Sequence, residues 1–299
     1  MFISRFAKQT LLLMFLLSPA LSHAQATVLA SVKPLQLIAA AITDGVSTPQ
    51  LLIPANQSPH NFSLRPSDVS HLTQADIVLW VGPGLETYLA NMFAQEAQRD
   101  RLLEAAAVPG IVLLDLSEHA HAHSAGEHYD PHLWLSTANA RVLARALHAK
   151  LVVLDSANAT QYDANLQQFE AALAQLDEAL QQQFATLREA PFAVFHNGTQ
   201  YFEEQVGIAH RFVLVPDHEI QPGIRHLLAL RAQLAERPLN CLFEDINSNE
   251  ATIDTVFQDN PVRRVMLDPL GDAVALSKVG YLQLISTMAG AIQQCLSPQ

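Results

Sequence analysis

From residue 28 onward, short apolar runs alternate with segments whose apolar residues recur every three or four positions. The short runs predict strands, and the longer periodic segments predict helices. In the first half of the chain the predicted strands are 28–32, 47–53, 76–81 and 111–116, and the predicted helices are 34–42, 66–74, 84–99 and 136–151. This alternation predicts an α/β fold with a mainly parallel sheet.

The stretch 158–189 has a different pattern. It contains no Gly or Pro, and its large apolar residues predict one long amphipathic helix. These residues are Tyr162, Leu166, Phe169, Leu173, Leu176, Leu180, Phe184 and Leu187. Such a stripe fits either a coiled-coil dimer or a rigid spine between two domains. The alternation then resumes, with predicted strands at 192–195, 211–215, 241–243 and 264–267, and predicted helices at 200–206, 224–235, 251–258 and 279–294.

The first residues have the pattern of a secretory signal peptide. Arg5 and Lys8 precede an unbroken apolar run at 11–17, and small residues follow it. We expect cleavage near Ala24 or Ala26 and export to the periplasm. The alternative is an uncleaved membrane anchor, but the apolar run is too short to span a bilayer comfortably.

Composition narrows the class of protein. Hydrophobic residues make up 49% of the 299 residues and charged residues 15%, which excludes a disordered chain. The net charge of -12 becomes -12 - 2 = -14 when Arg5 and Lys8 are removed with residues 1–24, so we expect no nucleic-acid partner. The two cysteines, Cys241 and Cys295, predict a disulfide in an oxidising compartment, with two free buried thiols as the alternative.

Histidines are numerous, at 13, and several gather in a polar segment at 118–128. They are His119, His121, His123 and His128. Neutral imidazole binds zinc and copper, so this segment is either an auxiliary metal-capture loop or a polar loop without a role in binding.

Four other residues lie where α/β proteins place ligands. His60 and His196 follow predicted strands, His132 precedes a predicted helix, and Asp268 ends the predicted strand 264–267. In open α/β sheets, ligands bind beyond the carboxyl ends of the strands. A lone histidine is more often a structural residue than a ligand, but three imidazoles and a carboxylate meeting between two domains would suit four-coordinate zinc.

Local strings strengthen this hypothesis. The segments PHNFSLRPSD at 59–68, DPHLWL at 130–135, VFH at 194–196 with YF at 201–202, and LDPLG at 267–271 resemble, in that order, the metal-ligand segments of the zinc- and manganese-binding solute-binding proteins of ABC importers. The string EIQPG at 219–223 and the two cysteines make the chain similar to the ZnuA-like zinc-binding members. The resemblance covers nearly the whole chain after the signal peptide.

The resemblance implies two pseudo-symmetric lobes with mainly parallel sheets, joined by a rigid helix, with metal in the cleft between them. We therefore expect an N-terminal lobe at 25–156, a linking helix at 157–190 and a C-terminal lobe at 191–299. It also implies a monomer that delivers zinc to an ABC-type permease in the inner membrane and is not an enzyme.

By motif, His60, His132 and His196 would bind zinc. Some relatives carry an acidic ligand before the first histidine; here that residue is Pro59, which leaves the fourth position to Asp268 or to water. Relatives that bind manganese place a carboxylate where His196 stands, and a third imidazole favours zinc over manganese.

Two functions from other classes remain as alternatives. A zinc hydrolase would use a three-histidine site to activate water, but the chain has no His-Glu-x-x-His string, and we assign Glu244 and Asp245 to structure. A periplasmic zinc buffer would act through the segment 118–128. A manganese-binding member of the same family is a third possibility.

Overall fold

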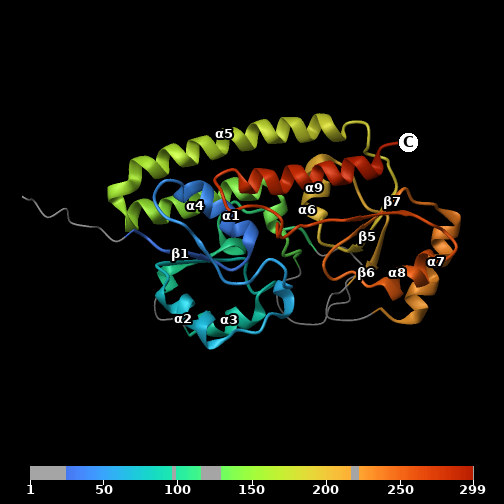
Figure 1. Ribbon diagram of the computed structural model, residues 1–299, viewed down its shortest axis with the longest axis horizontal. Helices are drawn as coiled ribbons and strands as arrows, with labels where there is room; N and C mark the ends of the chain where they lie inside the picture. The colour runs from blue at the N-terminus through green and yellow to red at the C-terminus, as the bar shows by residue number, and fades with distance from the viewer. Residues whose placement is uncertain (1–24, 96–98, 116–128, 217–221, 299) are drawn as a thin grey trace, which may run out of the picture.

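The computed structural model describes residues 25–95, 99–115, 129–216 and 222–298 (Figure 1). The chain forms two four-stranded sheets, in the orders β2-β1-β3-β4 and β6-β5-β7-β8, and all six pairings are parallel. The two sheets share one strand order, so the predicted α/β fold with two similar lobes is confirmed. The predicted signal peptide 1–24 and the histidine-rich segment 118–128 lie outside the described residues.

The N-terminal lobe follows the predicted alternation closely. Its strands are β1 (Val28–Ala30), β2 (Gln50–Leu51), β3 (Ile77–Trp80) and β4 (Leu102–Glu104). Its helices are α1 (Lys33–Thr43), α2 (Pro66–Gln74), α3 (Thr87–Phe93) and α4 (Thr137–Leu154). Ser136 caps α4, because its side chain accepts the backbone N–H of Asn139. Among the described residues of the predicted helix 84–99, the α-helical segment is Thr87–Phe93.

The strand predicted at 111–116 is wrong within the described residues. The fourth strand of this sheet is β4, a three-residue segment too short to produce a recognisable pattern. Val112 lies on the surface, and the Asn139 side chain bonds to both its N–H and its carbonyl oxygen. The apolar run at 111–114 therefore resembles a strand in sequence, but its backbone bonds to the Asn139 and Tyr201 side chains and to the backbone of Asp130.

Helix α5 (Ala159–Phe184) is the predicted long helix and joins the two lobes. Figure 1 shows it running along one side of the molecule, with α9 (Gly280–Leu296) beside it. Its apolar stripe, including Tyr162, Phe169 and Leu173, is buried against α4, α1 and α9 of the same chain. Because the apolar stripe packs against helices of the same chain, the structure supports the interpretation of α5 as a rigid spine between two domains.

The C-terminal lobe contains the second sheet and four helices. Its strands are β5 (Phe192–His196), β6 (Phe212–Val215), β7 (Cys241–Glu244) and β8 (Arg263–Met266). Its helices are α6 (Gln200–Val206), α7 (Ile224–Glu236), α8 (Glu250–Phe257) and α9. The predicted Cys241–Cys295 disulfide is present and ties the start of β7 to the end of α9. Because α9 also packs on α1 and α5, it connects this sheet to the N-terminal lobe.

Strand β5 separates two hydrophobic clusters. Phe192 and Val194 belong to a core that continues through α5 and α9 into the N-terminal lobe. Ala193 and Phe195 point to the other face and pack in a smaller cluster with α7 and α8. This two-residue period is that of a central strand covered on both faces. His196, the last residue of β5, is therefore held at the end of a fully buried strand.

Glu86 is a fully buried carboxylate at the carboxyl ends of β1 and β3. It accepts the Ser31 hydroxyl and the backbone N–H groups of Val81 and Gly82. Burial raises the pKa of this carboxyl to about 7, although the three hydrogen bonds oppose the shift. The group links the ends of the two central strands at the cost of holding a carboxylate away from water.

Replacing Glu86 with Gln should change how stability depends on pH. The pKa of Glu86 is higher in the folded protein than in the unfolded chain, so the folded protein binds more protons. The contribution of Glu86 to folding stability is therefore lost as the pH rises from about 4.5 through 7. Between pH 5 and pH 8, the free energy of unfolding of Glu86→Gln relative to wild type should rise by roughly 2–3 kcal/mol. Urea titrations at several pH values measure this difference. Glu178→Gln, an exposed change on α5, should keep the wild-type pH dependence, and parallel curves for wild type and Glu86→Gln would contradict the prediction.

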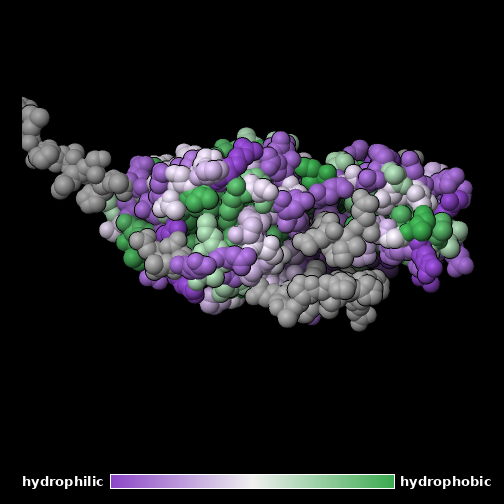
Figure 2. Space-filling view, turned by 90° about the horizontal axis from the view of Figure 1, so that it is seen from below, coloured by the Kyte–Doolittle hydropathy of each residue, from purple (hydrophilic) through white to green (hydrophobic). Residues whose placement is uncertain are grey.

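The surface carries hydrophobic side chains in small, separate groups. Figure 2 shows one face on which hydrophilic residues are widely distributed between such groups. Ile224 and Leu228, one turn apart on α7, form one exposed pair. Across the described part of the chain, none of the helices has both the length and the apolar character needed to cross a membrane.

Candidate metal centre

Three of the predicted ligands lie together. His60 is in the 3₁₀ helix η1 (Pro59–Asn61), His132 directly precedes the 3₁₀ helix η4 (Leu133–Leu135), and His196 ends β5. The ring centroids of His60 and His132 are 5.4 Å apart, and those of His132 and His196 are 5.3 Å apart. The tertiary structure thus gathers three imidazoles from segments more than 60 positions apart in sequence.

This spacing is close to what a zinc ion requires. With tetrahedral coordination and Zn–N distances of roughly 2.0–2.1 Å, the centroids of two ligating imidazoles lie about 5 Å apart. Within the described residues, no group of three or more His, Cys, Asp or Glu side chains is already arranged to hold a metal ion. The separation of the rings therefore suits zinc, although the described side chains are not arranged around a metal position.

His132 is oriented by its own loop. The Asp130 carboxylate accepts the backbone N–H of His132 at 2.9 Å and pairs with its Nδ1 at 2.7 Å. Both side chains are buried, with Asp130 fully inaccessible to solvent. A carboxylate on one ring nitrogen sets the direction of the other, which is the usual arrangement behind a metal-binding histidine.

His196 has a similar partner, Asp245, and the sequence interpretation missed it. Nδ1 of His196 pairs with the Asp245 carboxylate. The reason is the strand register: β5 and β7 are parallel neighbours in which Val194 is opposite Phe243, so the residues after them reach the same edge of the sheet. The sequence already placed Asp245 just after a predicted strand, but not beside the strand of His196. Asp245 is therefore part of the site and not only of the structure.

Electrostatics keep two of these imidazoles neutral at ordinary pH. Withdrawal from water, followed by the proximity of His132 and His196, holds the pKa of His60 well below its usual value. Burial also lowers the pKa of His196, although the Asp245 carboxylate opposes the shift. Burial acts to raise the pKa of Asp245, but its contact with His196 leaves the pKa lower than usual. Neutral imidazoles can accept a cation without first losing a proton.

The hydrogen bonds of the Asp268 side chain lie within its own loop. Its two carboxylate oxygens accept the backbone N–H groups of Asp272 and Ala273, both at 3.0 Å, within the loop after β8. The carboxylate holds its own turn together. The structure brings the three histidine rings close to one another, and the carboxylates that pair with two of them are Asp130 and Asp245.

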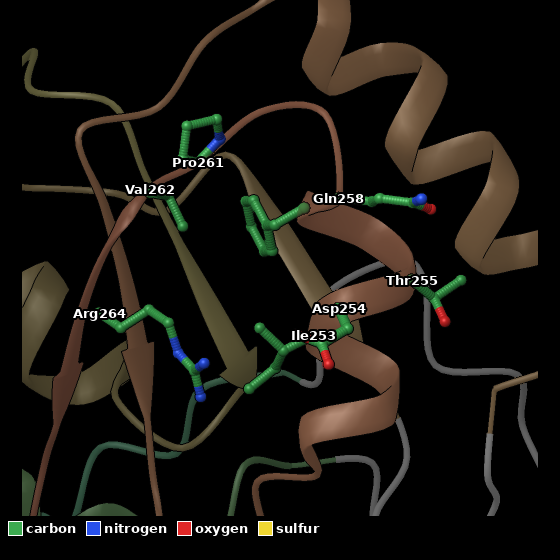
Figure 3. Close-up of a pocket in the computed structure, with 8 residues that line it drawn as sticks. Ile253, Asp254, Thr255, Gln258, Pro261, Val262 and Arg264 are labelled. Carbon is green, nitrogen blue, oxygen red and sulfur yellow. The ribbon is translucent and has the colours of Figure 1, made fainter.

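Four of the predicted residues fall in a part of the chain that the structure does not describe, and one pocket forms away from the predicted ligands. His119, His121, His123 and His128 are outside the described residues. A pocket of about 620 Å³ opens on the C-terminal lobe between α8 and β8 (Figure 3). Its lining includes Ile253, Phe257 and Arg264, but none of the predicted ligands. Arg264 is bonded there to Glu244 and Glu250, so the pocket is separate from the histidines.

Comparison with known proteins identifies the family. The family model described as "ZnuA: Zinc-uptake complex component A periplasmic" matches residues 28–295. The chain belongs to the ZnuA family. The ZnuA protein of Yersinia pestis, named a high-affinity zinc uptake system protein, is 33% identical over 301 residues, covering 94% of each chain. That of Haemophilus ducreyi is 32% identical, covering 92% of this chain and 94% of the relative.

Solved structures agree with this assignment. A crystal structure of ZnuA superimposes with a TM-score of 0.78 at 25% identity, covering 92% of this chain and all of the other. A ZnuA deletion mutant with zinc bound has a TM-score of 0.77 at 24% identity, which supports the fold. ZnuA proteins are transport components and not enzymes, as the sequence motifs predicted. Membership therefore disfavours the zinc hydrolase.

Proposed function

We propose that this chain captures zinc in the periplasm through His60, His132 and His196 and delivers it to an ABC-type permease in the inner membrane. The family supports the general function, since its members are periplasmic components of zinc uptake. The observation that carries the proposal is the three adjoining imidazole rings, with centroids 5.3 and 5.4 Å apart. Zinc is the cargo of this site, not a catalytic cofactor.

We assign Nε2 of His132 and of His196 as the donor atoms, because Nδ1 of each ring pairs with a carboxylate. Three imidazoles favour zinc over manganese, which prefers harder oxygen ligands. Water takes the fourth position in this proposal. Asp268, predicted from sequence as the alternative fourth ligand, accepts two backbone N–H groups of its own loop.

The rest of the sequence-based account is carried forward as part of the proposal. Residues 1–24 are a signal peptide cleaved near Ala24 or Ala26, followed by a lobe at 25–156, the linking helix at 157–190 and a lobe at 191–299. The protein acts as a monomer and, with its net charge of -12, has no nucleic-acid partner. The segment 118–128 provides auxiliary capture through His119, His121, His123 and His128.

The test of this function is the metal retained after the purified protein is equilibrated with equal zinc and manganese. Wild type and a variant lacking 118–128 are compared after extensive dialysis. We expect each to retain one tightly bound zinc, because the three rings lie outside the deleted segment. Elemental analysis gives the stoichiometry of both metals.

Two other outcomes would change the functional assignment. Retention of manganese in place of zinc would mean that the ligand set has been misread and would favour the manganese-binding alternative. Loss of zinc together with residues 118–128 would favour a zinc buffer that works through the histidine-rich segment.

A further inference from the structure

Helix α6 starts four residues after His196, and two of its side chains reach across to the segment that carries His132. The Tyr201 hydroxyl donates to the carbonyl oxygen of Asp130 at 2.7 Å. The same hydroxyl accepts the backbone N–H of Leu114 at 3.1 Å. One phenol thus joins the C-terminal lobe to two backbone positions of the N-terminal lobe, one of them two residues before His132.

The other end of the segment is held by the same helix. The backbone N–H of Thr137 donates to Oε1 of Gln205 at 2.9 Å, and Nε2 of Gln205 donates to Asp177 of α5 at 3.2 Å. Residues 130–137, with His132 among them, are therefore bonded at both ends to side chains of α6. We name this arrangement of Tyr201 and Gln205 the α6 bracket.

We propose that Tyr201 is a positioning residue for zinc binding that acts through His132. The inference rests on the proposed function. The α6 bracket fixes His132 to the element that follows His196, so two ligands from different lobes are held in one arrangement before the metal arrives. His60 lies outside the bracket; the Tyr88 hydroxyl, which bonds to the Pro59 carbonyl, holds its segment to the N-terminal lobe.

The hydrogen bonds of the Tyr201 hydroxyl lie in a buried region of the protein. Tyr201 is 3% exposed and Asp130 is not exposed at all. Without the hydroxyl, the Asp130 carbonyl and the Leu114 N–H would each lose a partner in a region that water hardly reaches, and the segment would shift to find new ones. The same residue, Asp130, orients the His132 ring, so a shift of its backbone moves the donor nitrogen.

The first test is zinc affinity in Tyr201→Phe, which keeps the ring and removes only the hydroxyl. We expect the Kd for zinc to rise about tenfold, the range seen when a group behind a metal ligand is lost. The matched control is Tyr162→Phe, which removes a hydroxyl bonded to Asp155 at 2.9 Å in an equally buried place where α4 meets α5. It should leave the Kd unchanged.

A double-mutant cycle separates positioning from a general structural role. If Tyr201 acts through His132, adding Tyr201→Phe to His132→Ala should change the Kd by less than twofold. A full tenfold effect in that background would overturn the proposal. The visible spectrum of bound Co²⁺ gives a second readout: Tyr201→Phe should alter the ligand-field bands, whereas Tyr162→Phe should not.

Gln205→Leu tests the other end of the α6 bracket. If Tyr201→Phe does not fold, this variant tests whether the bracket positions His132. It should raise the Kd several-fold and, like Tyr201→Phe, lose its effect when His132 is alanine. Wild-type affinity in a folded Tyr201→Phe or Gln205→Leu protein would overturn the inference while leaving the proposed function intact. If His132→Ala itself binds zinc as wild type does, the proposed function fails first.

Discussion

Replacing His132 with alanine is expected to weaken zinc binding by about a hundredfold or more. A four-ligand zinc site contributes roughly 10–16 kcal/mol, or on the order of 3 kcal/mol per ligand, and each 1.4 kcal/mol changes the affinity about tenfold. His132 is central to the cluster, since its ring adjoins those of both His60 and His196. His60→Ala and His196→Ala should have effects of the same order. Competition with a chelator of known zinc affinity measures each Kd.

The control for the histidine series is His148→Ala. His148 is on α4 and pairs with Asp163 of α5 at 2.7 Å, so it is a partnered histidine that is not part of the cluster. Its replacement should leave the Kd for zinc unchanged. Near-normal affinity in any one of the three ligand variants would remove that residue from the proposed site, and near-normal affinity in all three would place the tight site elsewhere.

Replacing Asp245 with Asn should weaken zinc binding by about tenfold to a hundredfold. The change keeps the shape of the side chain but removes the negative charge that pairs with Nδ1 of His196. Without that charge, the ring loses both its fixed orientation and the partner that favours a positively charged metal complex. Isothermal titration with zinc, with a competing chelator present, gives the affinity.

Asp268→Asn is the comparison that distinguishes the two carboxylates. Asp268 bonds to backbone N–H groups of its own loop, so its replacement should change the Kd by no more than about threefold if water completes the site. A large loss in Asp268→Asn together with a small loss in Asp245→Asn would reverse this assignment. It would mean that the sequence motif identified the fourth ligand correctly.

Much of the fold could be read from local pattern. Apolar periodicity located helix α5, which the sequence placed at 158–189 and the structure at Ala159–Phe184, and it predicted α2 and α6 with the residues that the structure shows. Helix α5 is predictable because its buried face recurs at the helical period. The strand at 111–116 failed for the opposite reason: a short apolar run carries no period, and the Asn139 side chain decided how its backbone is bonded.

The candidate site likewise combines residues that local motifs predicted with contacts that only the fold creates. The histidine motifs are local, and they pointed to His60, His132 and His196, which the structure brings together. The partner of His196 is not local. Asp245 reaches it because β5 and β7 are neighbours in the order β6-β5-β7-β8, and that order results from the packing of both faces of the sheet. The α6 bracket is likewise a contact between lobes, with no counterpart in the pattern of either segment.

The sequence by itself therefore determined the class of fold, the long helix between the lobes, the disulfide pair and the three imidazoles, because each is encoded by periodicity, by residue type or by a local motif. Only the tertiary structure decided which carboxylates accompany the imidazoles and what holds them. Strand order and contacts between lobes depend on free energy summed over many distant residues, and no local segment of the chain contains that information.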